Sequence, residues 1–283
     1  MSLPSAPAPP CSTEPAPRPA GLPGRDGDER LERDLLHALE QEQLVLHYQP
    51  RVCLVTRRTV GAEALARWPH RRRGMVPPSA FIPCAEQTGL IVKLGGWALL
   101  AACAEAARWP AGVVSVNVSA RQLAEGVLLR QVRAALDASG LPPERLEVEL
   151  TESLLVDANV ETLLTLSAVR DLGVGIALDD FGTGYASLAA LKRLPLTVMK
   201  LDRSLIRGVP RYREDTAIAR AVVEAGHALD LAIVAEGISG EEQCQFLAAL
   251  GCEEGQAYFF AHPLPGQQFR QHLGGTLPQE AAL

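Results

Sequence analysis

The sequence VGIALDDFGTGY, from Val174 to Tyr185, joins a short apolar run to two adjacent aspartates. The run Val174–Leu178 is bounded by turn-forming residues, which is typical of a buried strand. Two carboxylates at the end of such a strand are costly unless a positive charge lies between them, and a divalent cation would supply that charge. A strand running into an Asp-rich turn, with Gly182 and Gly184 as its permissive residues, is the alternative. This stretch alone does not choose between them.

The same arrangement recurs along the chain, where apolar runs deliver a polar residue at their ends. The runs are residues 112–116, 146–148, 196–199 and 231–235, and the polar residues are Asn117, Glu149, Lys200 and Glu236, with Gln256 after a less apolar run. Helical spacing follows several runs, as at Ile218, Val222 and Ala225. Alternating strands and helices predict a βα-barrel or a doubly wound sheet. In a barrel the C-terminal ends of the strands share one mouth, which favours a metal site there over an isolated turn.

The motif EAL at Glu63–Leu65, within GAEALARW (Gly61–Trp68), resembles the signature of EAL-domain phosphodiesterases, which hydrolyse cyclic di-GMP. Further segments resemble this family in the family's own order: LHYQP (46–50), PSAFIP (78–83), AEQTGLI (85–91), VNVSARQL (116–123), ELTES (149–153), the Asp179–Asp180 stretch, KLD (200–202) and AEG (235–237). The resemblance covers roughly residues 31 to 264. It implies an α/β fold, a modified TIM-type (β/α)8 barrel known as the EAL fold.

The resemblance implies a cyclic-guanylate-specific phosphodiesterase of bacterial second-messenger signalling, which opens cyclic di-GMP to linear 5'-pGpG. Two ions of Mg²⁺ or Mn²⁺, about 3.5–4 Å apart, would neutralise the phosphate and lower the pKa of a bridging water. The implied ligands of one ion are Glu63, Asn117, Glu149 and Asp179, and those of the other are Asp179, Asp180 and Glu236.

The resemblance also implies catalytic and substrate-binding roles. Lys200 would hydrogen-bond the attacking water or stabilise charge on the phosphate. Glu236 is a candidate general base as well as a ligand, and the sequence does not separate the two roles. Glu152 would hold the Asp179–Tyr185 loop in place, because ligands usually need such support. The implied substrate-binding residues are Gln49, Arg67, whose fork suits phosphate, and Gln256.

Some members of this family bind cyclic di-GMP without cleaving it, so a receptor that signals through a partner protein is the alternative function. Every implied ligand and the lysine are present, which favours hydrolysis. Departures from the family pattern are Ala66 for Leu, Ser239 for Glu and Ala257 for Gly. We expect the methyl of Ala257 to narrow the ligand path or strain the backbone. An unrelated metal-dependent barrel enzyme, enolising or decarboxylating, is a third hypothesis, for which cyclic di-GMP would have no effect.

Composition indicates one globular domain, because 283 residues of which 47% are hydrophobic suffice for one large core. We expect a disordered Pro-rich leader at residues 1–28, the EAL domain at 29–275 and a tail at 276–283. Neither a signal peptide nor a membrane-spanning run is evident, and the six cysteines lack disulfide or zinc spacing, so we expect a cytoplasmic protein without membrane contact. A net charge of −6 argues against nucleic-acid binding. The resemblance implies a homodimer, and regulation would come through self-association, a regulatory partner or substrate supply.

Other features have ordinary interpretations. The cluster Arg71–Arg73, with Arg57–Arg58 upstream, would steer a dianionic nucleotide, but a solvated loop explains it better. Asp202 is expected to cap the following helix. Glu147 shares a strand face with Glu149 by the two-residue period, and family order alone selects Glu149. Three histidines are expected to be structural: His47, His227 and His262.

Overall fold

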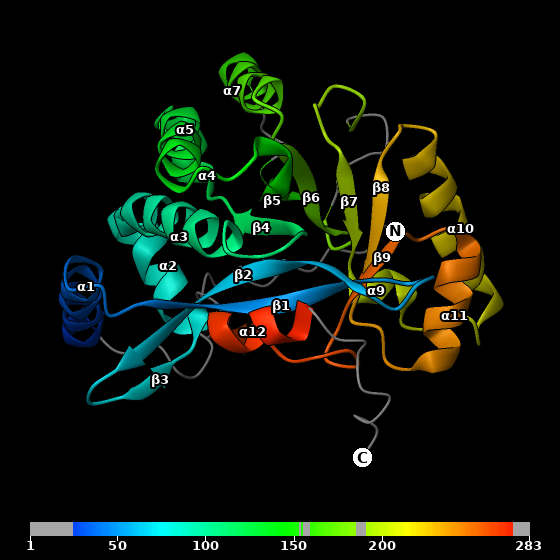
Figure 1. The fold of residues 1–283 in the computed structure, drawn as a ribbon, viewed down its shortest axis with the longest axis horizontal. Helices are drawn as coiled ribbons and strands as arrows, with labels where there is room; N and C mark the ends of the chain where they lie inside the picture. Colours follow the sequence, from blue (N-terminus) through cyan, green and yellow to red (C-terminus); the bar gives the residue numbers. More distant parts are fainter. Residues whose placement is uncertain (1–24, 153, 155–158, 185–190, 274–283) are drawn as a thin grey trace, which may run out of the picture.

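The computed structural model describes residues 25–152, 154, 159–184 and 191–273. Eight strands close into a barrel in the order β1-β9-β8-β7-β6-β5-β4-β2, with β2 pairing back to β1 (Figure 1). Strand β1 is antiparallel to both neighbours, whereas the other strands of the ring are parallel to each other. The eight strands are β1 (Val45–Cys53), β2 (Thr59–His70), β4 (Val113–Asn117), β5 (Leu146–Thr151), β6 (Gly175–Phe181), β7 (Val198–Leu201), β8 (Ala232–Glu236) and β9 (Glu254–Gln256). The predicted modified TIM-type barrel is therefore confirmed.

Two short strands extend the ring, since β3 (Gly74–Val76) pairs with β2 and β10 (Leu264–Pro265) pairs with β1. Helices surround the barrel, with α3, α5 and α7 along one side and α10 and α11 along the other (Figure 1). Their bounds are α1 (Arg25–Glu40), α2 (Pro78–Thr88), α3 (Leu90–Ala106), α4 (Ala120–Ala124), α5 (Leu128–Ser139), the 3-10 helix η1 (Pro143–Arg145), α7 (Val160–Asp171), α9 (Arg203–Ile206), α10 (Arg213–His227), α11 (Glu241–Leu250) and α12 (Gly266–Leu273). No helix among the described residues is long and apolar enough to cross a membrane.

The boundaries of the expected domains lie partly outside the described residues. Helix α1 begins at Arg25, within the expected leader, and its apolar face packs Leu31 and Leu35 beside Trp68 and Phe81. Residues 1–24 and 274–283, which hold most of the leader and the tail, lie outside the described residues. The first helix therefore belongs to the packed part of the chain.

The barrel strands divide their side chains between two environments. Residues such as Val148, Ile176 and Leu178 face outward and join the main core under the helices. Ala177 and Val198 belong instead to a small separate cluster with a residue of β8. Since strand side chains alternate with period two, this cluster shares the inward face with Asp179 and Lys200, two positions further along their strands. A small apolar layer thus lies beneath a polar one inside the barrel.

Glu147 shares the inward face of β5 with Glu149, which lies two positions further along the strand, and both are buried. The Arg51 guanidinium donates a hydrogen bond to the Glu147 carboxylate and another, at 2.8 Å, to Glu254 Oε2. Arg51 and Glu147 have side chains only 3% and 5% exposed. Burial alone would lower the pKa of Arg51, but the adjacent carboxylates of Glu147 and Glu254 raise it. The two-residue period was therefore correct, and each glutamate has a different cationic partner.

We predict that Arg51→Met lowers the free energy of unfolding by about 3–5 kcal/mol, because it leaves the buried Glu147 carboxylate without its counter-ion. The double variant Arg51→Met/Glu147→Leu should recover most of this loss, since both charges leave together. Urea denaturation followed by circular dichroism measures both. An Arg51→Met variant within about 1 kcal/mol of wild type would contradict the prediction.

Candidate metal centre at the barrel mouth

The strand ends gather the predicted ligands at one mouth. Parallel register places Asn117 opposite Glu149, and Glu236 opposite Gln256, while the antiparallel pair β1–β2 places Gln49 opposite Glu63. The polar residues that meet there are Gln49, Glu63, Asn117, Glu149, Asp179, Asp180, Lys200, Glu236 and Gln256. The repeated pattern of apolar run and terminal polar residue therefore corresponds to one spatial cluster, as a barrel requires.

The Lys200 ammonium lies among four carboxylates. Its Nζ is 2.8 Å from Glu236 Oε1, 2.9 Å from Asp179 Oδ1 and 3.0 Å from Glu149 Oε2. Glu63 Oε2 is 3.6 Å away, and the Lys200 side chain is only 1% exposed. Burial alone would lower the pKa of Lys200, but the surrounding carboxylates raise it well above its usual value. Lys200 is therefore charged, and one positive charge lies among four carboxylates.

The carboxylates around Lys200 have shifted pKa values. Burial raises the pKa of Glu236 to about 7, although Lys200 opposes the shift. Burial, together with the nearby Glu63 charge, raises the pKa of Glu149 well above its usual value. Burial would also raise the pKa of Glu63, but Lys200 and the amide donors of Gln256 and Asn117 lower it. One ammonium does not neutralise this site, which favours either protons or an added cation.

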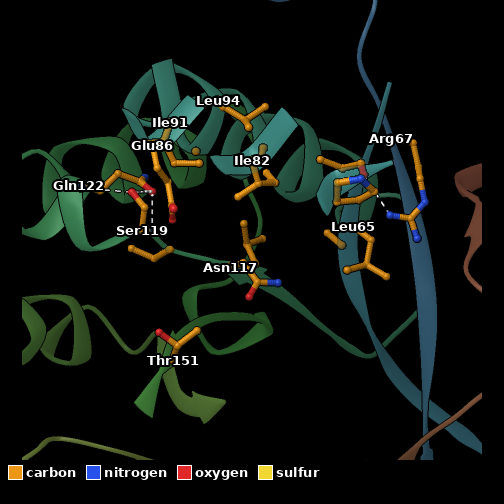
Figure 2. Close-up of a pocket in the computed structure, with 17 residues that line it drawn as sticks. Leu65, Arg67, Ile82, Glu86, Ile91, Leu94, Asn117, Ser119, Gln122 and Thr151 are labelled. Carbon is orange, nitrogen blue, oxygen red and sulfur yellow. Dashed lines mark hydrogen bonds between the residues drawn. The ribbon is translucent and has the colours of Figure 1, made fainter. Parts of the chain in front are cut away.

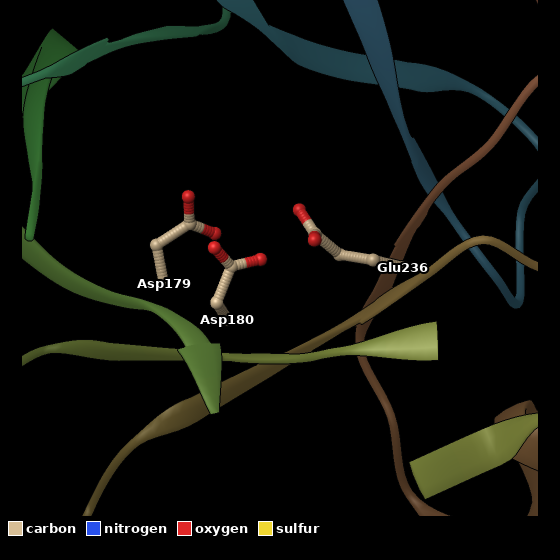
Figure 3. A group of neighbouring side chains, drawn as sticks. All are labelled: Asp179, Asp180 and Glu236. Carbon is tan, nitrogen blue, oxygen red and sulfur yellow. The ribbon is translucent and has the colours of Figure 1, made fainter. Parts of the chain in front are cut away.

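Asp179 and Asp180 point the same way because the strand is distorted between them. Adjacent strand residues normally face opposite sides, but Asp180 has a φ of 56° and the β6–β7 register shifts between Leu178 and Phe181. Oxygens of Asp179, Asp180 and Glu236 consequently lie within 4.8 Å of one another, and their carboxylates converge in Figure 3. Such a set of oxygen donors can hold a hard divalent cation.

Amide groups complete the cluster on the side of Glu63. Asn117 Nδ2 donates to Glu63 Oε1 at 2.6 Å, and Gln256 Nε2 donates to Glu63 Oε2 at 2.6 Å. Gln256 Nε2 also lies 3.4 Å from Gln49 Oε1. Glu149 Oε1 and Gln256 Oε1 are buried acceptors with no hydrogen-bond partner among the described residues. Because an unsatisfied buried acceptor is costly, these two oxygens fit a cation or its bound water.

Glu152 lies behind the ligands and holds the backbone that carries them. Its Oε2 accepts from the backbone N–H of Gly182 at 3.2 Å and of Gly184 at 3.0 Å. A Cβ at Gly184 would lie 3.0 Å from the Glu152 carboxylate, so a side chain there would crowd this contact. The last residue of the predicted loop, Tyr185, lies outside the described residues. The remaining acid of the region, Asp202, caps α9 through a 2.8 Å hydrogen bond from the Ser204 N–H, as predicted.

A cavity of about 300 Å³ opens beside the cluster, and sequence reasoning missed it. Asn117, which donates to Glu63 in the cluster, also lines this cavity, and Arg67 lines it from β2 (Figure 2). Its wall is largely apolar; it includes Leu65, Ile82, Ile91, Leu94 and Gln122. Arg67 donates from NH1 to the Ala66 carbonyl oxygen at 3.0 Å. Segments 78–83 and 85–91, which the sequence analysis quoted without assigning them a role, supply part of this wall.

The structure differs from the sequence analysis in two respects: the backbone strain at Ala257 and the grouping of Arg57 with Arg71–Arg73. Ala257 is buried in the main core and its backbone does not adopt a left-handed conformation, so its methyl causes no strain of that kind. Arg57 does not join Arg71–Arg73, because it lies beyond the other end of β2 and pairs with Glu241 at 2.6 Å. Ser239 donates to Gln243 Oε1 from both its N–H, at 2.8 Å, and its hydroxyl, at 3.1 Å. It therefore secures the start of α11.

The three histidines contact residues other than those of the acidic cluster. His47 is paired with Leu65 and Pro265 across the sheet, and burial together with Arg67 lowers its pKa. His227 Nε2 lies 3.2 Å from Glu253 Oε1, and His262 stacks on Tyr258 with 4.4 Å between ring centroids. These contacts are compatible with structural roles.

The chain matches the EAL domain family over residues 32–263. The bifunctional diguanylate cyclase/cyclic di-GMP phosphodiesterase MucR of Pseudomonas aeruginosa is 43% identical over 244 residues, which cover 84% of this chain and 36% of MucR. The cyclic di-GMP phosphodiesterase PdeR of Escherichia coli is 38% identical over 246 residues, covering 85% of this chain and 37% of PdeR. The chain thus spans about a third of the length of these relatives.

Solved structures agree with this match. The PaMucR phosphodiesterase in complex with c-di-GMP is similar with a TM-score of 0.79 and 42% identity, covering 85% of this chain and 99% of that one. The EAL domain of Mycobacterium smegmatis DcpA is similar with a TM-score of 0.72 and 33% identity, covering 83% of this chain and 99% of that one. The barrel, its acidic mouth and these matches together show that the chain belongs to the EAL domain family.

Proposed function

We propose that this protein is a metal-dependent phosphodiesterase that hydrolyses cyclic di-GMP to linear 5'-pGpG. The observation that carries the proposal is the convergence of Asp179, Asp180 and Glu236 within 4.8 Å, beside a cavity that Arg67 lines. The names of MucR and PdeR and the c-di-GMP complex of PaMucR support this substrate. Clustered carboxylates serve phosphate hydrolysis only if cations offset their charge, which is why we propose Mg²⁺ or Mn²⁺.

The residues at the mouth would hold two ions. Glu63, Asn117, Glu149 and Asp179 would bind one, and Asp179, Asp180 and Glu236 would bind the other. Such ions, when bound, neutralise the phosphate and lower the pKa of coordinated water. The fit rests on the oxygen donors and on the unsatisfied acceptor Glu149 Oε1.

The other polar side chains would orient substrate and water. Lys200 stays protonated among its carboxylates, so it would donate a hydrogen bond to the attacking water or to a phosphate oxygen. Glu236, whose pKa is raised to about 7, is suited to accept a proton near neutral pH when it is not bound as a ligand. Gln256 holds Glu63 through Nε2 and keeps Oε1 available, and Gln49 lies beside it.

Arg67 and the cavity would bind the nucleotide. The Arg67 guanidinium can grip a phosphate with two parallel hydrogen bonds. The apolar wall that includes Leu65 and Ile91 suits the face of a purine base, because removing planar apolar surface from water lowers the free energy of the complex.

A homodimer, a regulatory protein partner and a cytoplasmic location are also part of the proposal. Domain bounds of 29–275 are proposed as well.

The deciding experiment measures cyclic di-GMP hydrolysis by purified protein with Mg²⁺ or Mn²⁺, with binding followed separately in Ca²⁺. Linear product from wild type but not from Glu63→Ala supports the phosphodiesterase. Binding without product supports the alternative, a receptor that signals through a partner. If neither binding nor product is observed, the phosphodiesterase and the receptor are both contradicted. A metal-dependent enzyme with a different substrate is then the remaining hypothesis.

We predict that Asp179→Asn lowers kcat by more than about 100-fold, because it removes the carboxylate charge that both ions would share. This loss of rate should exceed the roughly 10–100-fold loss expected when a residue that only supports a ligand is removed. Asp137→Asn is the matched control, since Asp137 is an exposed carboxylate on α5. Its kcat should equal that of wild type. Product formation by Asp179→Asn at more than a tenth of the wild-type rate would contradict the role.

Glu152→Ala should lower kcat by about 10–100-fold while cyclic di-GMP binding in Ca²⁺ changes little, because Glu152 hydrogen-bonds the backbone that follows Asp179 and Asp180. Glu152→Gln keeps an acceptor for the two glycine N–H groups and should restore most of the rate. Equal losses in both variants would show that the charge of Glu152, rather than its hydrogen bonds, matters.

A further inference from the structure

A second cavity, of about 570 Å³, lies between α1 and the turn that joins β2 to β3. It shares no lining residue with the cavity beside the acidic mouth. The residues that line it are Arg30, Asp34, His37, Gln43, His70, Arg71, Arg72 and Arg73. Figure 1 shows α1 and this hairpin together at one side of the molecule, away from the helices α10 and α11. The cavity is therefore a distinct feature, outside the barrel interior.

The charge of this cavity opposes that of the chain. Four of its eight lining residues are arginines and one is an aspartate, in a chain whose net charge is −6. Asp34 Oδ2 pairs with Arg73 NH2 at 3.5 Å and with His70 Nε2 at 3.4 Å. No carboxylate of the described residues pairs with Arg30, Arg71 or Arg72. Among the described residues, these three guanidinium groups therefore have no carboxylate partner, although they surround one cavity.

The turn that carries these arginines is organised from within. His70 Nδ1 accepts the backbone N–H groups of Arg72, at 3.1 Å, and Arg73, at 3.2 Å. The His70 ring packs edge-on against the fully buried Trp68, with 5.2 Å between ring centroids. Because the turn is anchored to the core, its side chains project from a defined backbone. Arg71, Arg72 and Arg73 are exposed, which agrees with the solvated loop that the sequence favoured, but the backbone of this loop is anchored.

We propose that this cavity binds an anion that carries two or more phosphate groups. Guanidinium forks match phosphate oxygens through paired hydrogen bonds, and several forks around one hollow suit several charges. A volume of about 570 Å³ exceeds what a single phosphate fills and lies within the range of pockets for small-molecule ligands. Asp34 pairs with Arg73 and contacts His70 Nε2, and it leaves Arg30, Arg71 and Arg72 for the ligand. The site is independent of the proposed hydrolysis.

The test is isothermal titration of the full chain with inorganic tripolyphosphate, orthophosphate and ATP, in EDTA at fixed ionic strength. EDTA removes divalent ions, so the carboxylate-rich mouth repels these anions and contributes no binding. We expect saturable one-to-one binding of tripolyphosphate, at least tenfold tighter than orthophosphate and weakened by added salt. Equal binding of ATP and tripolyphosphate would show that the phosphates alone are recognised. Tighter binding of ATP would show that the cavity also contacts the nucleoside.

Variants assign the binding to the cavity. Arg71→Ala/Arg72→Ala should weaken tripolyphosphate binding at least tenfold, and Arg30→Gln should weaken it from the opposite wall. Arg130→Ala/Arg133→Ala is the matched control, because it removes two exposed arginines from α5 and should bind as wild type does. Thermal unfolding without ligand shows whether each variant is folded. No saturable binding by wild type, or equal weakening by the α5 control, would overturn the proposal.

Discussion

The structure depends on one buried ammonium, that of Lys200, which lies within 3.0 Å of three carboxylates inside a closed barrel. The charge on Lys200 reduces the repulsion between strand ends that all carry acids. It does not remove that repulsion, because burial still raises the pKa of Glu149 and Glu236. The remaining negative charge is what makes the mouth suited to divalent cations. Lys200 thus influences both the burial of these acids and the net charge of the mouth.

A barrel allows this arrangement because it separates two kinds of burial. Outward strand residues pack under the helices in the main core, while inward residues form layers. Arg51 with Glu147 forms one polar layer, and the Lys200 cluster at the mouth forms another. Both layers pair buried carboxylates with a buried cation, which lowers the cost of placing charge in the low-polarity interior. The two environments let β5 carry acids and apolar residues alternately while remaining buried on both faces.

Much of the barrel and of its polar mouth could be predicted from the sequence, because the end of each strand is marked by neighbouring residues. Runs such as 231–235, followed by Glu236, predict both the strand and the side chain at the mouth. Asp202 was correctly expected to cap a helix, since capping depends on neighbouring residues only. The strain expected at Ala257 was wrong, because the backbone angle at that residue depends on packing that the sequence pattern does not reveal. The wall of the cavity beside Asn117 was missed for a similar reason, since its apolar residues look like any other core.

The sequence by itself determined the alternation of strands and helices, the polar residue at each strand end and the resemblance to one family. Those features depend on periodicity and residue type, which are local properties. Tertiary structure alone decided that Asp179 and Asp180 face the same space, because a register shift and a left-handed residue override the two-residue period. It likewise separated Arg57 from Arg71–Arg73 and placed the latter around a cavity with α1. Such distances are set by how distant segments pack, and no local pattern encodes them.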